Sequence, residues 1–266
     1  MDKHACRRLY SGAVMICLAI MLGTAACPAE TGAGAAVKAR HEKRDRSAEL
    51  RDLPITEMPE GGQPTDMLGI FITGDGGMWS LDKAVTRGMA DRGVPMIGIS
   101  SYKYFAKPRT PDETAADMWR ALRFCMKKWH KQRIVLMGYS LGAEIIPFVA
   151  TRAPEDLRDR VVMVVMLGPS AETVFEYHFM DWLFSTKKRP RYSVTAEIGK
   201  IQGPGVLCVT SALDRECICE ALEPGQVTVL KRAGGHHYNN NFMSLTEAIM
   251  QELKKAAAAA DAAPAP

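Results

Sequence analysis

The pentapeptide Gly138–Gly142, GYSLG, places a serine between two glycines and is the segment of the sequence best suited to chemistry. It lies between an apolar run that ends at residue 139 and an amphipathic segment that begins near Leu141. A strand that turns sharply into a helix at such a motif strains the serine and exposes its hydroxyl, while the glycines leave room for neighbouring backbone. The bare pattern is weak, but its strand-to-helix context makes Ser140 a candidate nucleophile.

Two further residues could activate this serine. A serine hydroxyl becomes nucleophilic when a histidine removes its proton, and an acid holds that histidine in place. Asp214 follows the apolar run that ends at residue 211, and His236 follows the next apolar run, in AGGHHY. Serine, acid and histidine is the chain order typical of a serine at a strand-to-helix turn. We therefore predict that Ser140, Asp214 and His236 form a catalytic triad.

Both partners of the serine have competitors nearby. His237 is adjacent to His236, which we favour because the glycine pair before it frees the loop to approach the serine. Glu216 could replace Asp214 but lies farther from the end of the strand. Both alternatives stay open from the sequence alone.

The stretch TGDGGMW, residues 73–79, follows another apolar run and could bind a phosphate or serve an oxyanion. A Walker loop needs Lys followed by Ser or Thr, and a dinucleotide loop needs G-x-G-x-x-G; the stretch has neither. We therefore predict an oxyanion hole made by the amide of Asp75 or Gly76 and the amide of Leu141. The side chains expected to contact the substrate are Asp75, Trp79 and Tyr139. No cofactor and no metal are expected.

The elements that must position these residues alternate along the chain. The strand-like runs are 67–73, 94–100, 133–139, 161–167, 205–211 and 226–232, and the helical segments are 81–92, 112–129, 141–152 and 242–255. Near-continuous apolar strands separated by helices indicate a parallel sheet covered on both faces. We predict an α/β fold with a mostly parallel sheet of about six or more strands, and functional residues where strands end.

Composition divides the chain into four parts. Residues 1–27 have a basic start, an apolar run and small residues before Cys27, which predicts an export signal and a possible lipoprotein signal. We expect a flexible linker over 28–62, the folded domain over 63–255 and a disordered Ala/Pro tail over 256–266. Of the net charge of +4, +2 lies in 1–27 and +1 in 28–52, which leaves +1. This balance gives no reason to expect nucleic acid binding.

Export would place the cysteines of the domain in an oxidising compartment, where disulfides form. The trio in GVLCVTSALDRECICE predicts a disulfide of Cys208 with Cys217 or, alternatively, with Cys219. No fourth ligand is spaced for zinc. Cys125 lies in a helical pattern and is expected to be a buried apolar residue.

The segment between Leu167 and Gly205 interrupts the alternation, with TVFEYHFMDWLFSTKKRPRY at its centre. One interpretation is a hairpin with a solvated basic turn. The other is a lid whose aromatic face lines a substrate cleft and whose basic edge meets an anionic membrane. The two interpretations are compatible.

Several segments together resemble the bacterial virulence protein family typified by VirJ and AcvB. They are FITGDGGMWSLDK, GISSYKYF, PDETAADM, VLMGYSLGAEIIPF, LGPSAETVFEYH and GGHHY, and the resemblance covers about residues 66–253. It implies an exported protein with the α/β-hydrolase fold, with the family's serine motif on Ser140 and its histidine motif on His236. AcvB-type members are associated with hydrolysis of lysyl-phosphatidylglycerol, and VirJ with type IV secretion.

Two hypotheses follow from these motifs and this resemblance. The first is an exported serine esterase that cleaves the aminoacyl ester of lysyl-phosphatidylglycerol or a related membrane lipid. The second is a non-catalytic periplasmic protein that uses the same fold to bind type IV secretion components. In both cases we expect a monomer in the periplasm, held at a membrane if Cys27 carries a lipid.

Overall fold

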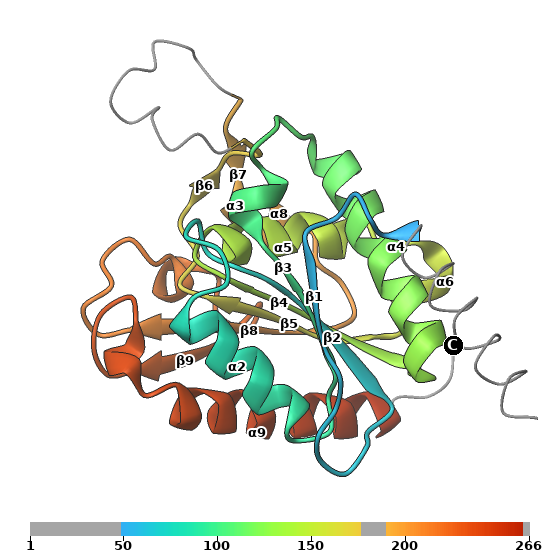
Figure 1. The fold of residues 1–266 in the computed structure, drawn as a ribbon. Coiled ribbons are helices and arrows are strands. Elements are labelled where there is room, and N and C mark those ends of the chain that lie inside the picture. Colours follow the sequence, from blue (N-terminus) through green and yellow to red (C-terminus); the bar gives the residue numbers. More distant parts are fainter. Residues whose placement is uncertain (1–48, 177–189, 263–266) are drawn as a thin grey trace, which may run out of the picture. The chain divides into compact units, whose positions relative to one another are not determined.

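The computed structural model describes residues 49–176 and 190–262 and contains a seven-stranded sheet of order β1-β3-β2-β4-β5-β8-β9 (Figure 1). The strands are β1 (Ile55–Met58), β2 (Met67–Ile72), β3 (Met96–Ile99), β4 (Arg133–Tyr139), β5 (Val161–Leu167), β8 (Gly205–Ser211) and β9 (Thr228–Arg232). Every neighbouring pair is parallel except β1, which pairs antiparallel with β3. The predicted α/β class with a mostly parallel sheet is confirmed.

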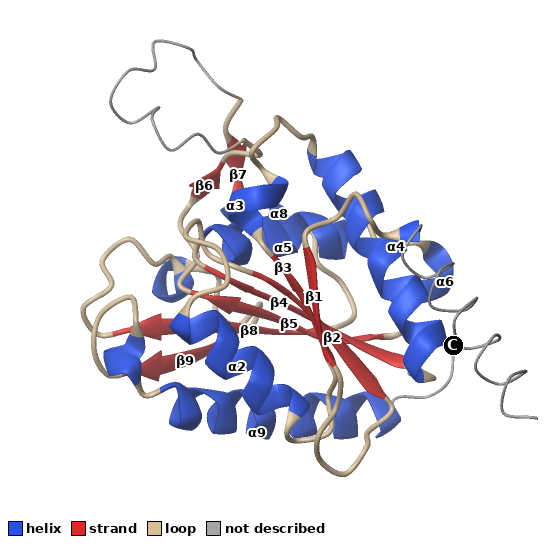
Figure 2. Ribbon diagram, viewed as in Figure 1, coloured by secondary structure: helices blue, strands red, loops and turns tan. Residues whose placement is uncertain are grey.

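Helices cover both faces of this sheet (Figure 2). Helices α2 (Ser80–Ala90) and α9 (Phe242–Ala262) pack on one face, and α4 (Pro111–Trp129) and α5 (Leu141–Thr151) on the other. The shorter elements are α3 (Ser101–Tyr104), α6 (Glu155–Arg158), α8 (Val194–Ile198), and the 3-10 turns η1 (Cys219–Ala221) and η2 (Tyr238–Asn240). Because β2, β3, β4, β5, β8 and β9 run parallel, their carboxyl ends meet at one edge of the sheet.

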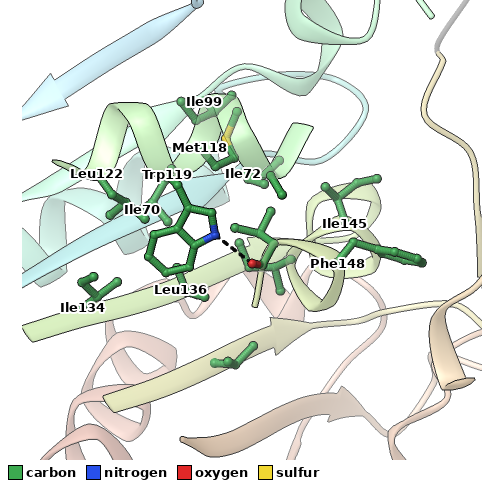
Figure 3. Close-up of a cluster of buried hydrophobic side chains, with 14 of the residues drawn as sticks. Ile70, Ile72, Ile99, Met118, Trp119, Leu122, Ile134, Leu136, Ile145 and Phe148 are labelled. Carbon is green, nitrogen blue, oxygen red and sulfur yellow. Dashed lines mark hydrogen bonds between the residues drawn. The ribbon is translucent and has the colours of Figure 1, made fainter. Parts of the chain in front are cut away.

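The side chains of each strand alternate between two apolar cores. In β2, Leu68, Ile70 and Ile72 face α4 and α5, whereas Phe71 faces α2 and α9. Figure 3 shows the indole of Trp119 among the first of these cores, where its Nε1 donates to the carbonyl oxygen of Val149 at 3.0 Å. This bond joins α4 to α5, so the helix that follows Ser140 is held against its neighbour.

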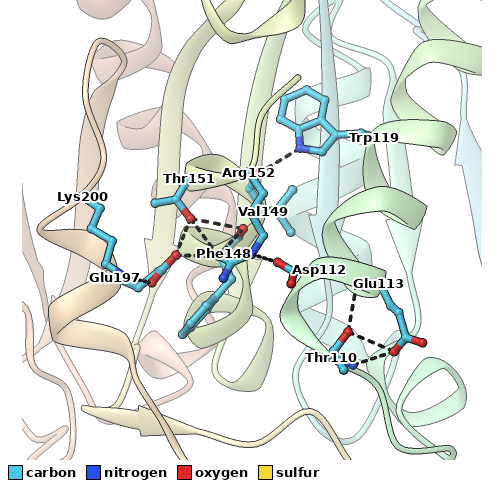
Figure 4. Close-up of polar contacts among 10 residues, drawn as sticks. All are labelled: Thr110, Asp112, Glu113, Trp119, Phe148, Val149, Thr151, Arg152, Glu197 and Lys200. Carbon is cyan, nitrogen blue, oxygen red and sulfur yellow. Dashed lines mark hydrogen bonds and ion pairs between the residues drawn. The ribbon is translucent and has the colours of Figure 1, made fainter. Parts of the chain in front are cut away.

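Polar contacts at the ends of the helices complete this anchoring (Figure 4). The carboxylate of Glu113 accepts from the N–H of Thr110 at 2.8 Å, and the Thr110 hydroxyl accepts from Glu113 N at 3.1 Å, which caps α4. At the end of α5, Arg152 reaches Asp112 and Glu197, each at 2.6 Å. One arginine therefore ties α5 to α4 and to α8.

The folded domain is longer than the expected 63–255. Strand β1 and the buried Leu50 and Leu53 lie inside the expected linker over 28–62. A four-residue edge strand that is half exposed carries no long apolar run, so its sequence resembles a linker. At the other end, α9 continues to Ala262 because alanine is the best helix former, and Ala257 is buried. The tail expected to be disordered over 256–266 is therefore helical to Ala262.

The predicted export signal, the predicted linker up to residue 48 and residues 177–189 lie outside the described residues. At the base of that last segment, β6 (Glu172–Thr173) pairs antiparallel with β7 (Tyr192–Ser193), as a hairpin requires. Phe175 is buried there against Phe148, and their rings meet edge to face at 5.3 Å. The basic turn and the lid interpretation fall on the residues that are not described. Within the described ranges, none of the helices has the length and apolar character to span a bilayer.

Candidate active site

The backbone around Ser140 forms a sharp turn between β4 and α5. Ser140 has φ 52 and ψ −120, a left-handed conformation that non-glycine residues rarely adopt, and its N–H donates to Leu167 O at 2.9 Å. A Cβ on Gly142 would overlap the carbonyl oxygen of Ile72, and a Cβ on Gly138 would overlap that of Gly142. The two glycines of GYSLG therefore let α5 approach β2 and β4 closely, which holds the serine in its strained position.

His236 and Asp214 meet on the loops that follow β9 and β8. His236 Nδ1 lies 2.6 Å from Asp214 Oδ2, and the Asp214 side chain is only 6% exposed. The N–H of Leu213 donates to Gly234 O at 3.0 Å, which joins the two loops beside the pair. Such a bond fixes the imidazole so that its other nitrogen is left for a substrate or a serine.

The two alternative residues, His237 and Glu216, are not part of this pair. The imidazole of His237 bonds to the Tyr139 hydroxyl, with Nδ1 2.8 Å from Oη, and not to an acid. Glu216 is exposed. Of the four possible pairings left open by the sequence, the structure contains the one between His236 and Asp214.

Gly168, which follows β5, lies directly against this pair. A Cβ added to Gly168 would stand 2.9 Å from His236 Cε1 and 3.2 Å from Asp214 Oδ2. Its φ of 64 is also left-handed. The closeness of this backbone means that only glycine leaves the imidazole and the carboxylate in their observed places.

A cleft of about 490 Å³ opens at this edge of the sheet. Its lining residues are Gly74, Asp75, Gly76, Gly77, Trp79, Ser80, Leu81, Asp82, Tyr139, Ser140, His236, His237, Asn240 and Phe242. The candidate nucleophile and base thus face one cavity, together with all three side chains expected to contact a substrate. Leu141 is the first residue of α5, so its N–H is among those without a partner inside the helix.

The cleft is negatively charged. Asp75 and Asp82 line it, and of the described residues that line it none is a lysine or an arginine. The pKa of Tyr139 is raised by burial and then by the negative charges of Asp82, Asp214 and Asp75. A site of this kind favours a cationic ligand.

Asp82 and Glu144 are two carboxylates that the sequence analysis did not find. Asp82 is 2% exposed and accepts from Gly74 N at 3.3 Å and Trp79 N at 3.0 Å, so it closes the 73–79 loop, and burial raises its pKa. Glu144 lies one turn past Ser140, and burial raises its pKa as well. The sequence feature that could have identified them is an acid in the first turn of a helix. Asp82 occupies the third position of α2, where acids cap helices, and Glu144 lies in the first turn of α5.

The disulfide joins Cys208 to Cys219, so the pairing of Cys208 with Cys217 is wrong. The turn η1 carries Cys219 inward, where it is fully buried against β8, whereas Cys217 remains half-buried. Cys217 keeps a free thiol whose Sγ lies 3.4 Å from Cys219 Sγ. Cys125 is buried as expected, and burial raises its pKa to about 12.

The fold is similar to that of solved hydrolases. Est1E from Butyrivibrio proteoclasticus has 16% identity and a TM-score of 0.56, over 77% of this chain and 96% of that one. A proline iminopeptidase from Mycobacterium smegmatis has 14% identity and a TM-score of 0.55, over 77% and 95%. An α/β serine hydrolase homologue from Coxiella burnetii has 15% identity and a TM-score of 0.52, over 75% and 90%. At these identities the likeness shows the α/β-hydrolase fold alone.

Sequence comparison identifies the family. No curated protein matches the chain. Residues 66–257, most of the folded domain, match the family described as bacterial virulence protein (VirJ). The segments around the 73–79 loop, the serine turn and GGHHY all lie inside this match. The chain belongs to the VirJ family of bacterial virulence proteins, and its fold is that of an α/β hydrolase.

Proposed function

We propose that the protein is an exported serine esterase that cleaves the aminoacyl ester of lysyl-phosphatidylglycerol or a related aminoacylated lipid. The observation that carries this proposal is that Ser140 and His236 line one cleft and that His236 is paired with the buried Asp214. Ser140 is the nucleophile, His236 the general base and Asp214 the acid that orients it. The hydrolase fold and the VirJ family support this assignment.

The geometry supports a two-step acyl transfer. Ser140 Oγ attacks the ester carbonyl while His236 takes its proton, and the oxyanion accepts from Leu141 N–H and from the 73–79 loop. The intermediate collapses, the ester C–O bond breaks, and the alcohol leaves with the proton from His236. Water then attacks the acyl-serine with His236 as base, which releases the amino acid and restores Ser140.

The charge of the cleft supports a cationic acyl group. Asp75 is exposed at the rim, where its carboxylate can receive an ammonium group of a lysyl ester. Trp79 and Tyr139 line the same cleft and offer aromatic faces to a cation. A lysyl group carries two ammonium groups, of which one can pair with Asp75 while the buried Asp82 adds negative charge behind it.

Exposed apolar side chains near the cleft support an amphiphilic substrate. Trp79 is 68% exposed, Leu213 beside Asp214 is 74% exposed, and Met243 beside Phe242 is 71% exposed. All three lie on segments that follow the carboxyl ends of strands, where the cleft opens. Together with the predicted export signal, they favour a reaction at a membrane surface of the periplasm, with Cys27 as a lipid anchor or near a cleavage point.

The test is release of free lysine from vesicles that contain lysyl-phosphatidylglycerol, using full-length protein and its Ser140→Ala variant. The wild type should release lysine, prefer lysyl over uncharged acyl esters, and lose turnover in the variant. Turnover retained by Ser140→Ala would overturn the assignment of the nucleophile. No turnover by the wild type, together with full function of Ser140→Ala in a deletion strain, would favour the non-catalytic protein associated with type IV secretion.

A further inference from the structure

The peptide that joins Gly74 to Asp75 is held by an unusual set of donors. Its carbonyl oxygen, on Gly74, accepts from the Thr73 hydroxyl at 3.0 Å, from the Ser101 hydroxyl, and from Gly77 N at 3.0 Å. Ser101 N in turn donates to the Thr73 hydroxyl at 3.0 Å. Both hydroxyl residues are fully buried. A network of this kind fixes the direction of one carbonyl.

The direction of that carbonyl determines the direction of an N–H. Because the peptide bond is planar and trans, the Gly74 carbonyl and the Asp75 N–H point to opposite sides of the same unit. The carbonyl points toward the buried hydroxyls, so the Asp75 N–H points away from them. Gly74, Asp75 and Ser140 line the same cleft, and a Cβ on Gly74 would stand 3.5 Å from Ser140 Cβ. The Gly74–Asp75 peptide unit therefore lies beside the nucleophile.

We propose that Thr73 and Ser101 are positioning residues that aim the Asp75 N–H into the oxyanion site, which makes Asp75 rather than Gly76 the donor from this loop. The proposal rests on the esterase function proposed above. It also gives a role to Ser101, the second serine in GISSYKYF, which no step of the reaction uses directly.

The two hydroxyls are needed because they prevent the Gly74–Asp75 peptide from rotating. If the Gly74–Asp75 unit rotated, a carbonyl oxygen would replace the N–H at the oxyanion site and repel the developing negative charge. Glycine at position 74 permits such a rotation. The Asp82 carboxylate holds Gly74 N from the other side at 3.3 Å, and the hydroxyls hold the carbonyl. Loss of either hydroxyl weakens this control without removing any group that touches the substrate.

The experiment compares Thr73→Val, Ser101→Ala and the double variant with Thr73→Ser, which retains the hydroxyl. Thr246→Val is the matched control, because Thr246 is equally buried and its hydroxyl bonds to Phe242 O within α9. The probes are hydrolysis of p-nitrophenyl acetate and binding of phenylboronic acid, which forms an anionic tetrahedral adduct on a catalytic serine. All are measured on full-length protein, with the folded fraction taken from circular dichroism.

Each single loss should lower kcat about 10-fold with little change in KM, and the double variant should lose about 100-fold, as for loss of one oxyanion donor. Phenylboronic acid affinity should fall by the same factors. Thr73→Ser and Thr246→Val should match the wild type. If the variants fold and retain wild-type kcat and boronate affinity, the hydroxyls are structural and the proposal is wrong. If the wild type itself hydrolyses no ester and binds no boronate, the esterase function has failed first.

Discussion

Replacement of Gly168 by alanine should lower both the folding stability and kcat, and the two effects can be measured separately. The φ of 64 would cost an alanine roughly 1–2 kcal/mol of folding stability. The new Cβ would stand 2.9 Å from His236 Cε1, whereas ordinary contacts begin at 3.4 Å, so the imidazole must retreat by about 3.4 − 2.9 = 0.5 Å. Since a 1 Å misplacement can cost about 100-fold, this retreat should lower kcat about 10-fold.

The assay is ester hydrolysis under saturating substrate, with stability measured by urea unfolding. Gly225→Ala is the control, because Gly225 also has a left-handed φ of 88 but nothing lies within 4 Å of an added Cβ. That variant should lose stability and keep its kcat. A Gly168→Ala protein that is destabilised but hydrolyses esters at the wild-type rate would refute the assignment of His236 and Asp214 to catalysis.

Three further predictions concern Asp214, the disulfide and the partly buried Glu144. Asp214→Asn should lower kcat on the order of 10³–10⁴-fold, and Glu216→Gln should not; equal losses in the ester assay would contradict the pairing seen here. Removing the Cys208–Cys219 disulfide, whose ends are 11 residues apart, should lower the free energy of unfolding by about 3 kcal/mol in urea denaturation, and an unchanged midpoint would contradict this. Because burial raises the pKa of Glu144 above 4.5, its charge destabilises the fold above that pH, so Glu144→Gln should stabilise at pH 7 and lose this gain below pH 4.5. A gain that is equal at both pH values would contradict it.

The sequence predicted those features that depend on local pattern. Six of the seven strands of the main sheet followed from apolar runs, and Ser140, Asp214 and His236 followed from the ends of those runs and from chain order. Gly168 was not predictable in the same way. Its contact with His236 arises only when β5, β8 and β9 pair in register, which joins residues far apart in the chain.

The choice between residues that are close in the sequence also required the three-dimensional structure. His236 and His237 are adjacent and identical in chemistry, and only the fold places one on an acid and the other on Tyr139. The inward direction of Cys219 depends on the short turn η1, which has no clear sequence signal. Strand β1 was missed because it is stabilised by pairing with β3 rather than by an apolar run of its own.

The turn at Ser140 is held by contacts of the main chain. The location of the side chain at position 140 therefore does not depend on which small side chain it is. The turn is possible because Gly138 and Gly142 have no side chains, which lets backbone carbonyl oxygens approach them closely. The serine hydroxyl takes no part in these contacts. A small side chain with a different terminal atom would therefore be presented at the same point above the sheet. A substitution at position 140 would therefore change the chemistry that the turn presents, whereas a side chain at position 138 or 142 would change the turn itself.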